Sequence, residues 1–184
     1  MILRIVKSFV IAIKVAVISF YNAFNFGKDV DDILGYCDEL TKLPNLKAFH
    51  RDNQSIDGEF ALVLIDVDNF KLINDYYGHS FGNFVLKRIA YILNHCVSFC
   101  GTAYRLHGDE FALIVKREEV KRICDEIESH FRKEDHFSLS QGIVVYEGKS
   151  ISFENLFKTA DKALYQSKKS GKGKTTMIPV IASL

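Results

Sequence analysis

The sequence predicts an α/β protein in which helices flank a mixed five-stranded sheet. Two short alternating apolar runs, 102–106 and 111–115, enclose the polar segment 107–110 and predict a β-hairpin. The near-continuous apolar run FALVLIDV at 60–67 predicts a central strand that is buried on both faces. The remaining two strands are expected at 137–146 and 175–181.

The segments between these strands have apolar residues at helical spacing, which predicts helices there. Gly78-His79-Ser80 should break one helical run in two, and Ser152 is a plausible N-cap for the last helix. Gly142 lies inside a predicted strand, which suggests that another part of the backbone approaches it closely. The expected helices are 46–51, 70–77, 83–95, 118–133 and 153–167.

Length and charge limit what the chain can be. Its 184 residues suffice for one domain with a sizeable core and a short additional element. The 24 basic and 23 acidic side chains nearly balance, so no overall field attracts a nucleic acid polymer, and we expect none as a partner. Any basic binding surface must therefore be local.

The four cysteines contain no CxxC pair, and the histidines show no spacing typical of metal ligands. Cys96 and Cys100 are spaced to share one helical face. We therefore expect all four cysteines to be small buried apolar residues in a reducing compartment, in preference to disulfides or metal ligands.

Residues 1–26 differ from the rest because they are apolar, lack acids and carry only three cations. They predict an N-terminal helix that needs a partner for its wide apolar side, either a membrane surface or a second copy of the chain. A true span is disfavoured by Lys14 at its centre and by the placement of the basic residues, and a strand remains open. Residues 27–37 form an acidic connector, and 38–184 form the main domain, which is expected to be cytoplasmic, free or held at the inner face of the membrane.

Acidic residues gather where the central strand and the hairpin end. Asp66 closes the buried run, and Asp109 and Glu110 lie in the hairpin turn, where Gly108 and His107 are residue types that tolerate a positive φ. Burying charged carboxylates is costly unless they are paired or bind a metal. If the hairpin lies beside the strand, the acids form an all-oxygen site suited to Mg²⁺ or Mn²⁺ and to phosphate chemistry.

Five motifs in order resemble the GGDEF domains, the diguanylate cyclases. They are DELTKLPN at 38–45, IDVDNFKLINDYYGHSFGN at 65–83, HGDEF at 107–111, SQG at 140–142 and ADKALYQSKKSGKGK at 160–174. The resemblance implies a palm-like, nucleotidyl-cyclase-like fold that holds one GTP per domain. Two domains would meet as a homodimer and condense two GTP into cyclic di-GMP and pyrophosphate.

The resemblance also assigns roles to individual residues. Asp66, Asp109, Glu110 and the Val67 carbonyl would hold the metal, with Asp109 and Glu110 as the catalytic acids. Asn74 and Asn83 would recognise the base. The remaining substrate contacts would be Phe70, Lys71, His107, Gly108, Lys168 and Lys172.

Several positions depart from the family pattern. His107 replaces the first glycine of the signature, Asn83 replaces an aspartate, and Lys172 replaces an arginine. Ser98 and Gly101 stand where many members carry an inhibitory RxxD motif, so no such product-binding site is expected. Two alternatives therefore stay open: a catalytically inactive nucleotide-binding module, and a cyclase of altered base preference.

Overall fold

The computed structural model describes residues 35–53, 58–131, 137–147 and 152–179. The expectations for residues 1–26, and for the connector up to residue 34, lie outside the described residues. Within the described ranges, no helix is long and apolar enough to cross a membrane.

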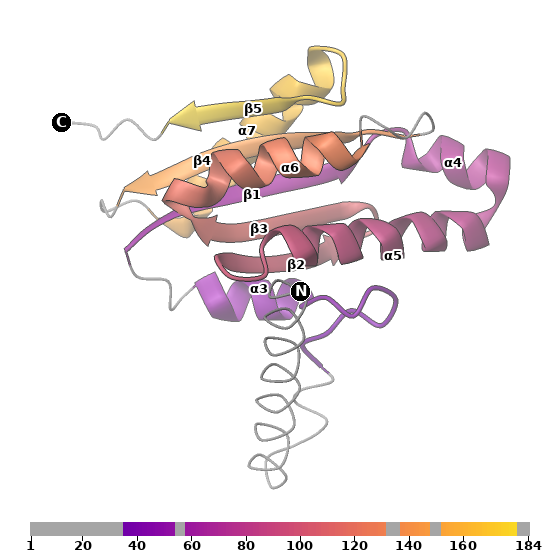
Figure 1. Cartoon of the computed structure of the whole chain (residues 1–184), viewed down its shortest axis with the longest axis horizontal. Coiled ribbons are helices and arrows are strands. Elements are labelled where there is room, and N and C mark those ends of the chain that lie inside the picture. The colour runs from indigo at the N-terminus through magenta and orange to yellow at the C-terminus, as the bar shows by residue number, and fades with distance from the viewer. Residues whose placement is uncertain (1–34, 54–57, 132–136, 148–151, 180–184) are drawn as a thin grey trace, which may run out of the picture. The chain divides into compact units, whose positions relative to one another are not determined.

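The five predicted strands form one mixed sheet in the order β2-β3-β1-β4-β5 (Figure 1). The central strand β1 pairs antiparallel with β3 on one side and with β4 on the other, whereas β5 runs parallel to β4. The expected fold class is therefore confirmed. The strands are β1 (Glu59–Val67), β2 (Gly101–His107), β3 (Glu110–Lys116), β4 (Leu139–Glu147) and β5 (Thr175–Pro179).

The helices cover both faces of this sheet. In Figure 1, α5 and α6 lie across one face and α7 lies behind the other. The second helix after β1 starts earlier than expected, at His79 in place of residue 83, because Gly78 alone, at φ 84°, breaks the run. The helices are α3 (Leu46–Asn53), α4 (Phe70–Tyr77), α5 (His79–Cys96), the short 3₁₀ helix η1 (Arg117–Glu119), α6 (Val120–Phe131) and α7 (Phe153–Lys169).

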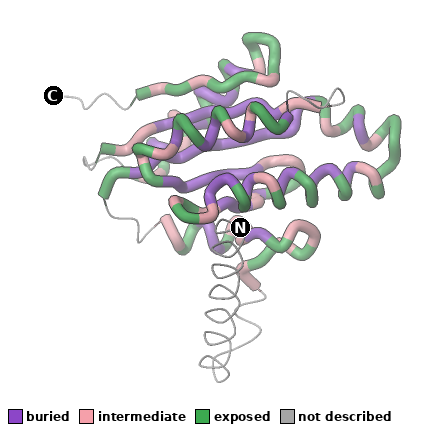
Figure 2. Tube along the Cα trace, viewed as in Figure 1, coloured by how far each residue is buried: buried purple, intermediate pink, exposed green. Residues whose placement is uncertain are grey.

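Alternation along β1 supplies two hydrophobic cores, one on each face of the sheet. Val63 and Ile65 belong to the core beneath α5 and α6, whereas Leu62 and Leu64 belong to the core shared with α3 and α7. Figure 2 shows the strands as the most continuously buried part of the domain. The two-sided burial explains why β1 reads as an almost unbroken apolar run.

Helix α7 packs directly on β4 because Gly142 has no side chain. A Cβ atom built at Gly142 would lie 2.2 Å from the Leu164 nitrogen and 2.3 Å from the Ala160 oxygen. The close backbone approach expected from the sequence is therefore confirmed. At the start of the same helix, the Ser152 side chain accepts a hydrogen bond from the Asn155 N–H at 3.3 Å, as expected of an N-cap.

The expectation for the cysteines is partly wrong. All four are free thiols, but Cys37 is exposed and Cys100 is only partly buried. Cys96 and Cys100 do not share a helical face, because α5 ends at Cys96 and a turn carries the chain into β2. Cys96 and Cys124 are buried as expected.

The Gly142 contact predicts a large cost for adding one methyl group. Gly142→Ala should lower the free energy of unfolding by about 3 kcal/mol, because its neighbours are backbone atoms of α7 that cannot rotate away. Urea denaturation measures the change. Gly82→Ala is the matched control, because its nearest neighbours are side-chain atoms of Asn74 and Phe70 that can move. Equal stability of the two variants would contradict the packing of α7 on β4.

Candidate active site

The register between β1 and β3 brings the predicted acids together. Asp66 is directly opposite Glu110 in the antiparallel ladder. One residue further on, the Val67 N–H donates a hydrogen bond to the Asp109 carbonyl at 3.2 Å. The register therefore brings Asp66 and Glu110 to the same end of the sheet, although the three acids are not among the described residues whose ligand atoms lie within 4.8 Å of one another.

The hairpin turn is held by Gly108 and by Arg105. Gly108 has a φ of 52°, as expected, whereas His107 is not among the described residues with positive φ. Nε and one terminal nitrogen of Arg105 donate to the Gly108 carbonyl at 3.1 and 2.7 Å, and the other donates to Asp38 at 2.9 Å. Arg105 thus ties the turn to the segment that precedes α3.

His107 and Glu110 face each other across the turn. His107 pairs with Glu110 in the ladder, and its Nε2 atom lies 3.4 Å from a Glu110 carboxylate oxygen. Two-thirds of the imidazole remains exposed. The histidine that replaces a family glycine therefore contacts one of the proposed metal-binding acids directly.

Asp66 is a nearly buried carboxylate with one close cationic partner. Its residue is only 9% exposed, and Lys168, in the last turn of α7, places Nζ 2.7 Å from its Oδ2 atom. Desolvation raises the pKa of Asp66, the Lys168 ammonium opposes that rise, and the charges of Asp109 and Glu110 add to it. Within the described residues, Lys168 is thus the close cationic partner of Asp66, while Asp109 and Glu110 act on it as like charges.

Asp68, the residue that follows β1, has no role assigned by the family resemblance. The residue is 2% exposed, and its carboxylate accepts hydrogen bonds from the hydroxyls of Ser138 and Ser140 at 2.6 and 2.7 Å. It also accepts one from the Gly173 N–H at 2.8 Å. One buried side chain therefore joins the end of β1, the start of β4 and the basic loop after α7.

A second contact fixes that basic loop to the start of α4. Lys172 Nζ donates to the Asn69 side-chain oxygen at 2.7 Å. Both residues have left-handed backbones, with φ of 62° at Lys172 and 58° at Asn69. Lys172, a predicted phosphate contact, is thus held beside the loop that follows Asp66 and Asp68, with ammonium protons left for another acceptor.

The predicted base-recognition residues lie apart, on the α4–α5 pair. The Asn74 side chain lies against Gly82. A Cβ atom built at Gly82 would lie 1.9 Å from the Asn74 Oδ1 atom and 3.2 Å from a carbon of the Phe70 ring. Asn83 and Lys71 are exposed on α5 and α4. The structure therefore places a glycine where Asn74 needs room, a relation that the sequence did not reveal.

A cavity of about 920 Å³ lies between the hairpin and α7. Of the predicted site residues, its lining includes His107, Glu110 and Lys168, together with Asp161 and Tyr165 of α7. This volume is in the range of small-molecule sites. Glu110 is the proposed metal-binding acid in this lining, which does not include the α4–α5 residues assigned to the base.

The donor set fits a hard divalent cation. Asp66, Asp109 and Glu110 offer carboxylate oxygens at one end of the sheet, and the Val67 carbonyl lies in the same backbone segment. Mg²⁺ and Mn²⁺ prefer such oxygen ligands. Burial of the Asp66 carboxylate is the main cause of its raised pKa, and a bound cation would offset that cost.

Comparison with known proteins gives one family. The family model described as "Diguanylate cyclase, GGDEF domain" matches residues 35–174. The chain is 35% identical over 153 residues to the bifunctional diguanylate cyclase/cyclic di-GMP phosphodiesterase MucR of Pseudomonas aeruginosa, covering 73% of this chain and 22% of that protein. It is 34% identical over 125 residues to diguanylate cyclase DgcS of Shewanella oneidensis, covering 65% and 42%. The chain thus spans less than half the length of these curated relatives.

A solved structure agrees with this match. The GGDEF domain of DgcB from Caulobacter crescentus, crystallised in complex with c-di-GMP, superposes with a TM-score of 0.69 at 27% identity. The alignment covers 77% of this chain and 95% of that domain.

The raised pKa of Asp66 predicts that its ionised carboxylate destabilises the metal-free fold near neutral pH. Because the folded-state pKa lies above the unfolded value, protonated Asp66 favours the fold at low pH, and that contribution is lost as pH rises through the folded pKa. Metal-free Asp66→Asn should therefore melt at a higher temperature than the unsubstituted protein near neutral pH. The difference should shrink as pH falls. Thermal unfolding with a chelator, from about pH 4 to pH 8, tests this against Asp75→Asn on the exposed face of α4. An advantage that grows with acidity would contradict the assignment.

The three hydrogen bonds of Asp68 predict a large loss on truncation. Asp68→Ala should lower the free energy of unfolding by about 3 kcal/mol, because two hydroxyls and one N–H lose a charged acceptor. Ser138→Ala, which removes only one of these donors, should cost about 1 kcal/mol. Chemical denaturation compares them, and equal small losses would show that Asp68 does not hold the three segments together.

Proposed function

Because the chain belongs to the GGDEF domain family, we propose that it is a diguanylate cyclase that condenses two GTP into cyclic di-GMP and pyrophosphate. The observation that carries the proposal is the register that sets Asp66 opposite Glu110, with Lys168 2.7 Å from Asp66. A buried carboxylate such as Asp66, with further acids close to it, is costly unless it serves binding or catalysis.

Asp66, Asp109, Glu110 and the Val67 carbonyl are proposed to hold Mg²⁺ or Mn²⁺. When bound, such an ion lowers the pKa of the attacking 3′-hydroxyl and neutralises charge on the α-phosphate. The protein's own part is positioning, because β1 and β3 present the acids from paired strands whose register is fixed by two hydrophobic cores. Lys168 neutralises Asp66 in this structure, and it would be free to contact the triphosphate if Asp66 held a metal.

The remaining substrate contacts are proposed to lie on α4 and α5, at the hairpin turn and in the basic loop after α7. Lys71, Lys172 and the Phe70 segment would hold the phosphates, with His107 and Gly108 bordering them at the hairpin. Asn74 and Asn83 would bind the base. Support comes from the Lys172–Asn69 contact, which sets the basic loop against the start of α4, and from the room that Gly82 leaves for Asn74.

One domain is proposed to supply half of the reaction site, with one GTP. Each 3′-hydroxyl would attack the α-phosphate held by the other domain, so the reaction requires a homodimer. Residues 1–26 are the proposed dimerisation or membrane-association element, followed by the 27–37 connector and the 38–184 cyclase domain. A cytoplasmic location, free or at the inner membrane face, gives access to GTP.

Asn83 supports a second candidate function, a cyclase of altered base preference. An aspartate can accept two hydrogen bonds from the guanine edge, whereas an asparagine amide offers one acceptor oxygen and a donor group. Asn83 is exposed near the start of α5, so the replacement of aspartate by asparagine falls at the edge of the proposed base site. The contact between His107 and Glu110 is the observation that favours the third possibility, a nucleotide-binding module without turnover.

Product identification separates these functions. The purified chain at high concentration, with Mg²⁺ or Mn²⁺ and GTP, ATP or both, should yield cyclic di-GMP by mass spectrometry, at a rate per domain that rises with concentration. Asp109→Ala is the inactive control. His107→Gly restores the family glycine and tests whether the histidine limits activity. A mixed or adenine dinucleotide would move the function to the second candidate. No product, with GTP still bound, would establish the binding module.

The place of Asn74 predicts a selective defect. Gly82→Ala should displace the Asn74 side chain and weaken GTP binding at least about tenfold, the cost of one buried hydrogen bond. Unfolding stability should change by no more than about 1 kcal/mol, because alanine favours the helix and Asn74 can rotate. Calorimetric titration with GTP measures the affinity, and Lys87→Ala on the exposed face of α5 is the control. Unchanged GTP affinity in Gly82→Ala would contradict the role of Asn74.

A further inference from the structure

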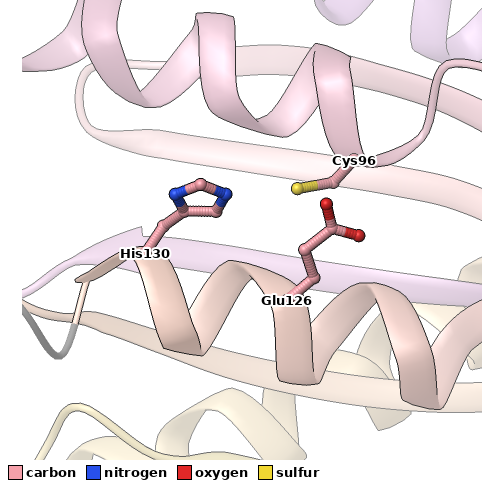
Figure 3. Close-up of side chains that lie close together, drawn as sticks. All are labelled: Cys96, Glu126 and His130. Carbon is pink, nitrogen blue, oxygen red and sulfur yellow. The ribbon is translucent and has the colours of Figure 1, made fainter. Parts of the chain in front are cut away.

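Three potential metal ligands meet where α5 ends beside α6, on the face of the sheet opposite α7 (Figure 3). Cys96 is the last residue of α5, and Glu126 and His130 are four residues apart on α6. Their ligand atoms all lie within 4.8 Å of one another. In Figure 3 the Cys96 sulfur points into the space between the His130 ring and the Glu126 carboxylate.

The kinds of atom in this cluster suit a different ion from the one proposed for Asp66. One sulfur, one imidazole nitrogen and one carboxylate oxygen form a mixed donor set, whereas the Asp66 site offers oxygen alone. Thiolate and imidazole favour Zn²⁺ over Mg²⁺ or Mn²⁺. We propose that Cys96, Glu126 and His130 form a zinc site with three protein ligands and a fourth position open to water.

The local geometry allows the cluster to close around an ion. Ligand atoms of a tetrahedral zinc site are about 3.5 Å apart, so a separation at the 4.8 Å limit would have to shrink by roughly 1.3 Å. The two α6 ligands lie on one face of the helix, at i and i+4, and both side chains can move. Cys96 is 4% exposed, whereas His130 is exposed and the Glu126 side chain is 35% exposed. The thiol is thus fixed, and the two mobile ligands lie on the solvent side, where an ion can enter.

Glu126 already contacts the Cys96 thiol and Arg122, and its carboxylate remains available to an ion. Arg122 donates to the Oε2 atom of Glu126 at 2.8 Å and also to Glu119 at 2.6 Å. A carboxylate has a second oxygen, so Glu126 can retain Arg122 and still ligate an ion. The Arg122 bond can then orient the carboxylate, as outer hydrogen bonds do at metal sites.

Zinc at this site would link two helices that otherwise meet through side-chain packing. The chain passes from Cys96 through residues 97–100 into β2, the strand that leads to the hairpin. Ion binding therefore fixes the point at which α5 leaves the helical layer, and it should stabilise the folded state by mass action. The site lies outside the proposed nucleotide site, so its occupancy can be measured without turnover.

Zinc titration of the reduced, metal-stripped full chain tests the proposal. A chromogenic chelator competes for Zn²⁺, and excess Mg²⁺ is present to occupy the Asp66 acids. We expect one tightly bound Zn²⁺ per chain, a higher melting temperature when it binds, and thiolate-to-metal absorption when Co²⁺ replaces it. Cys96→Ala, Glu126→Gln and His130→Ala should each weaken zinc affinity at least about tenfold.

Two controls match the chemistry of the substitutions. Cys37→Ala removes an exposed thiol elsewhere, and His50→Ala removes an exposed imidazole on α3, so both should bind zinc within about twofold of the unsubstituted chain. Glu126→Gln and His130→Ala change accessible side chains and keep the proposal testable if Cys96→Ala unfolds. Unchanged zinc affinity in these two variants, or Co²⁺ bound without thiolate absorption, would overturn it.

Discussion

The site depends on the register between β1 and β3. Successive side chains of a strand point to opposite faces of the sheet. If β3 slipped by one residue, a neighbour of Glu110 would lie opposite Asp66, and the side chains of β3 would change faces. The register is held by apolar residues of β1 that enter different cores on the two faces of the sheet. The same burial that fixes the register also removes water from Asp66 and raises its pKa. Stability and reactivity at this end of the sheet therefore have one origin, and the acids are presented by rigid elements, as phosphoryl chemistry requires.

Around this pair, polar contacts take over where the hydrophobic cores end. Asp68 joins the end of β1 to the start of β4 and to the loop after α7, and Lys172 joins that loop to Asn69. Arg105 performs the corresponding task at the hairpin turn. These contacts lie next to the proposed metal ligands, and they fix the positions of the ligands and of the basic loop. Substitutions at such positions should act on binding geometry as well as on stability.

The sequence predicted the parts of the fold that depend on local pattern. The apolar runs gave five strands, and the acids at the ends of two neighbouring runs gave the convergence of Asp66 with Glu110. The polar side-chain contacts that join distant segments could not be predicted. The partners of Asp68 lie 70, 72 and 105 positions away. For the same reason the histidine spacing gave no sign of a ligand set, because Cys96 and His130 meet only after α5 and α6 pack. The exposure of Cys37 was missed because residue type alone suggested burial.

Asp66 and Glu110 should act as one site, because the strand register places them together. Mn²⁺ binding, followed by electron paramagnetic resonance in the presence of a non-reactive GTP analogue, tests this most directly. Asp66→Asn and Glu110→Gln should each lose the nucleotide-dependent bound ion while the fold is retained. The substitution Glu118→Gln, on the short 3₁₀ helix η1, should keep it. Retention of the bound Mn²⁺ in both site variants would contradict the account.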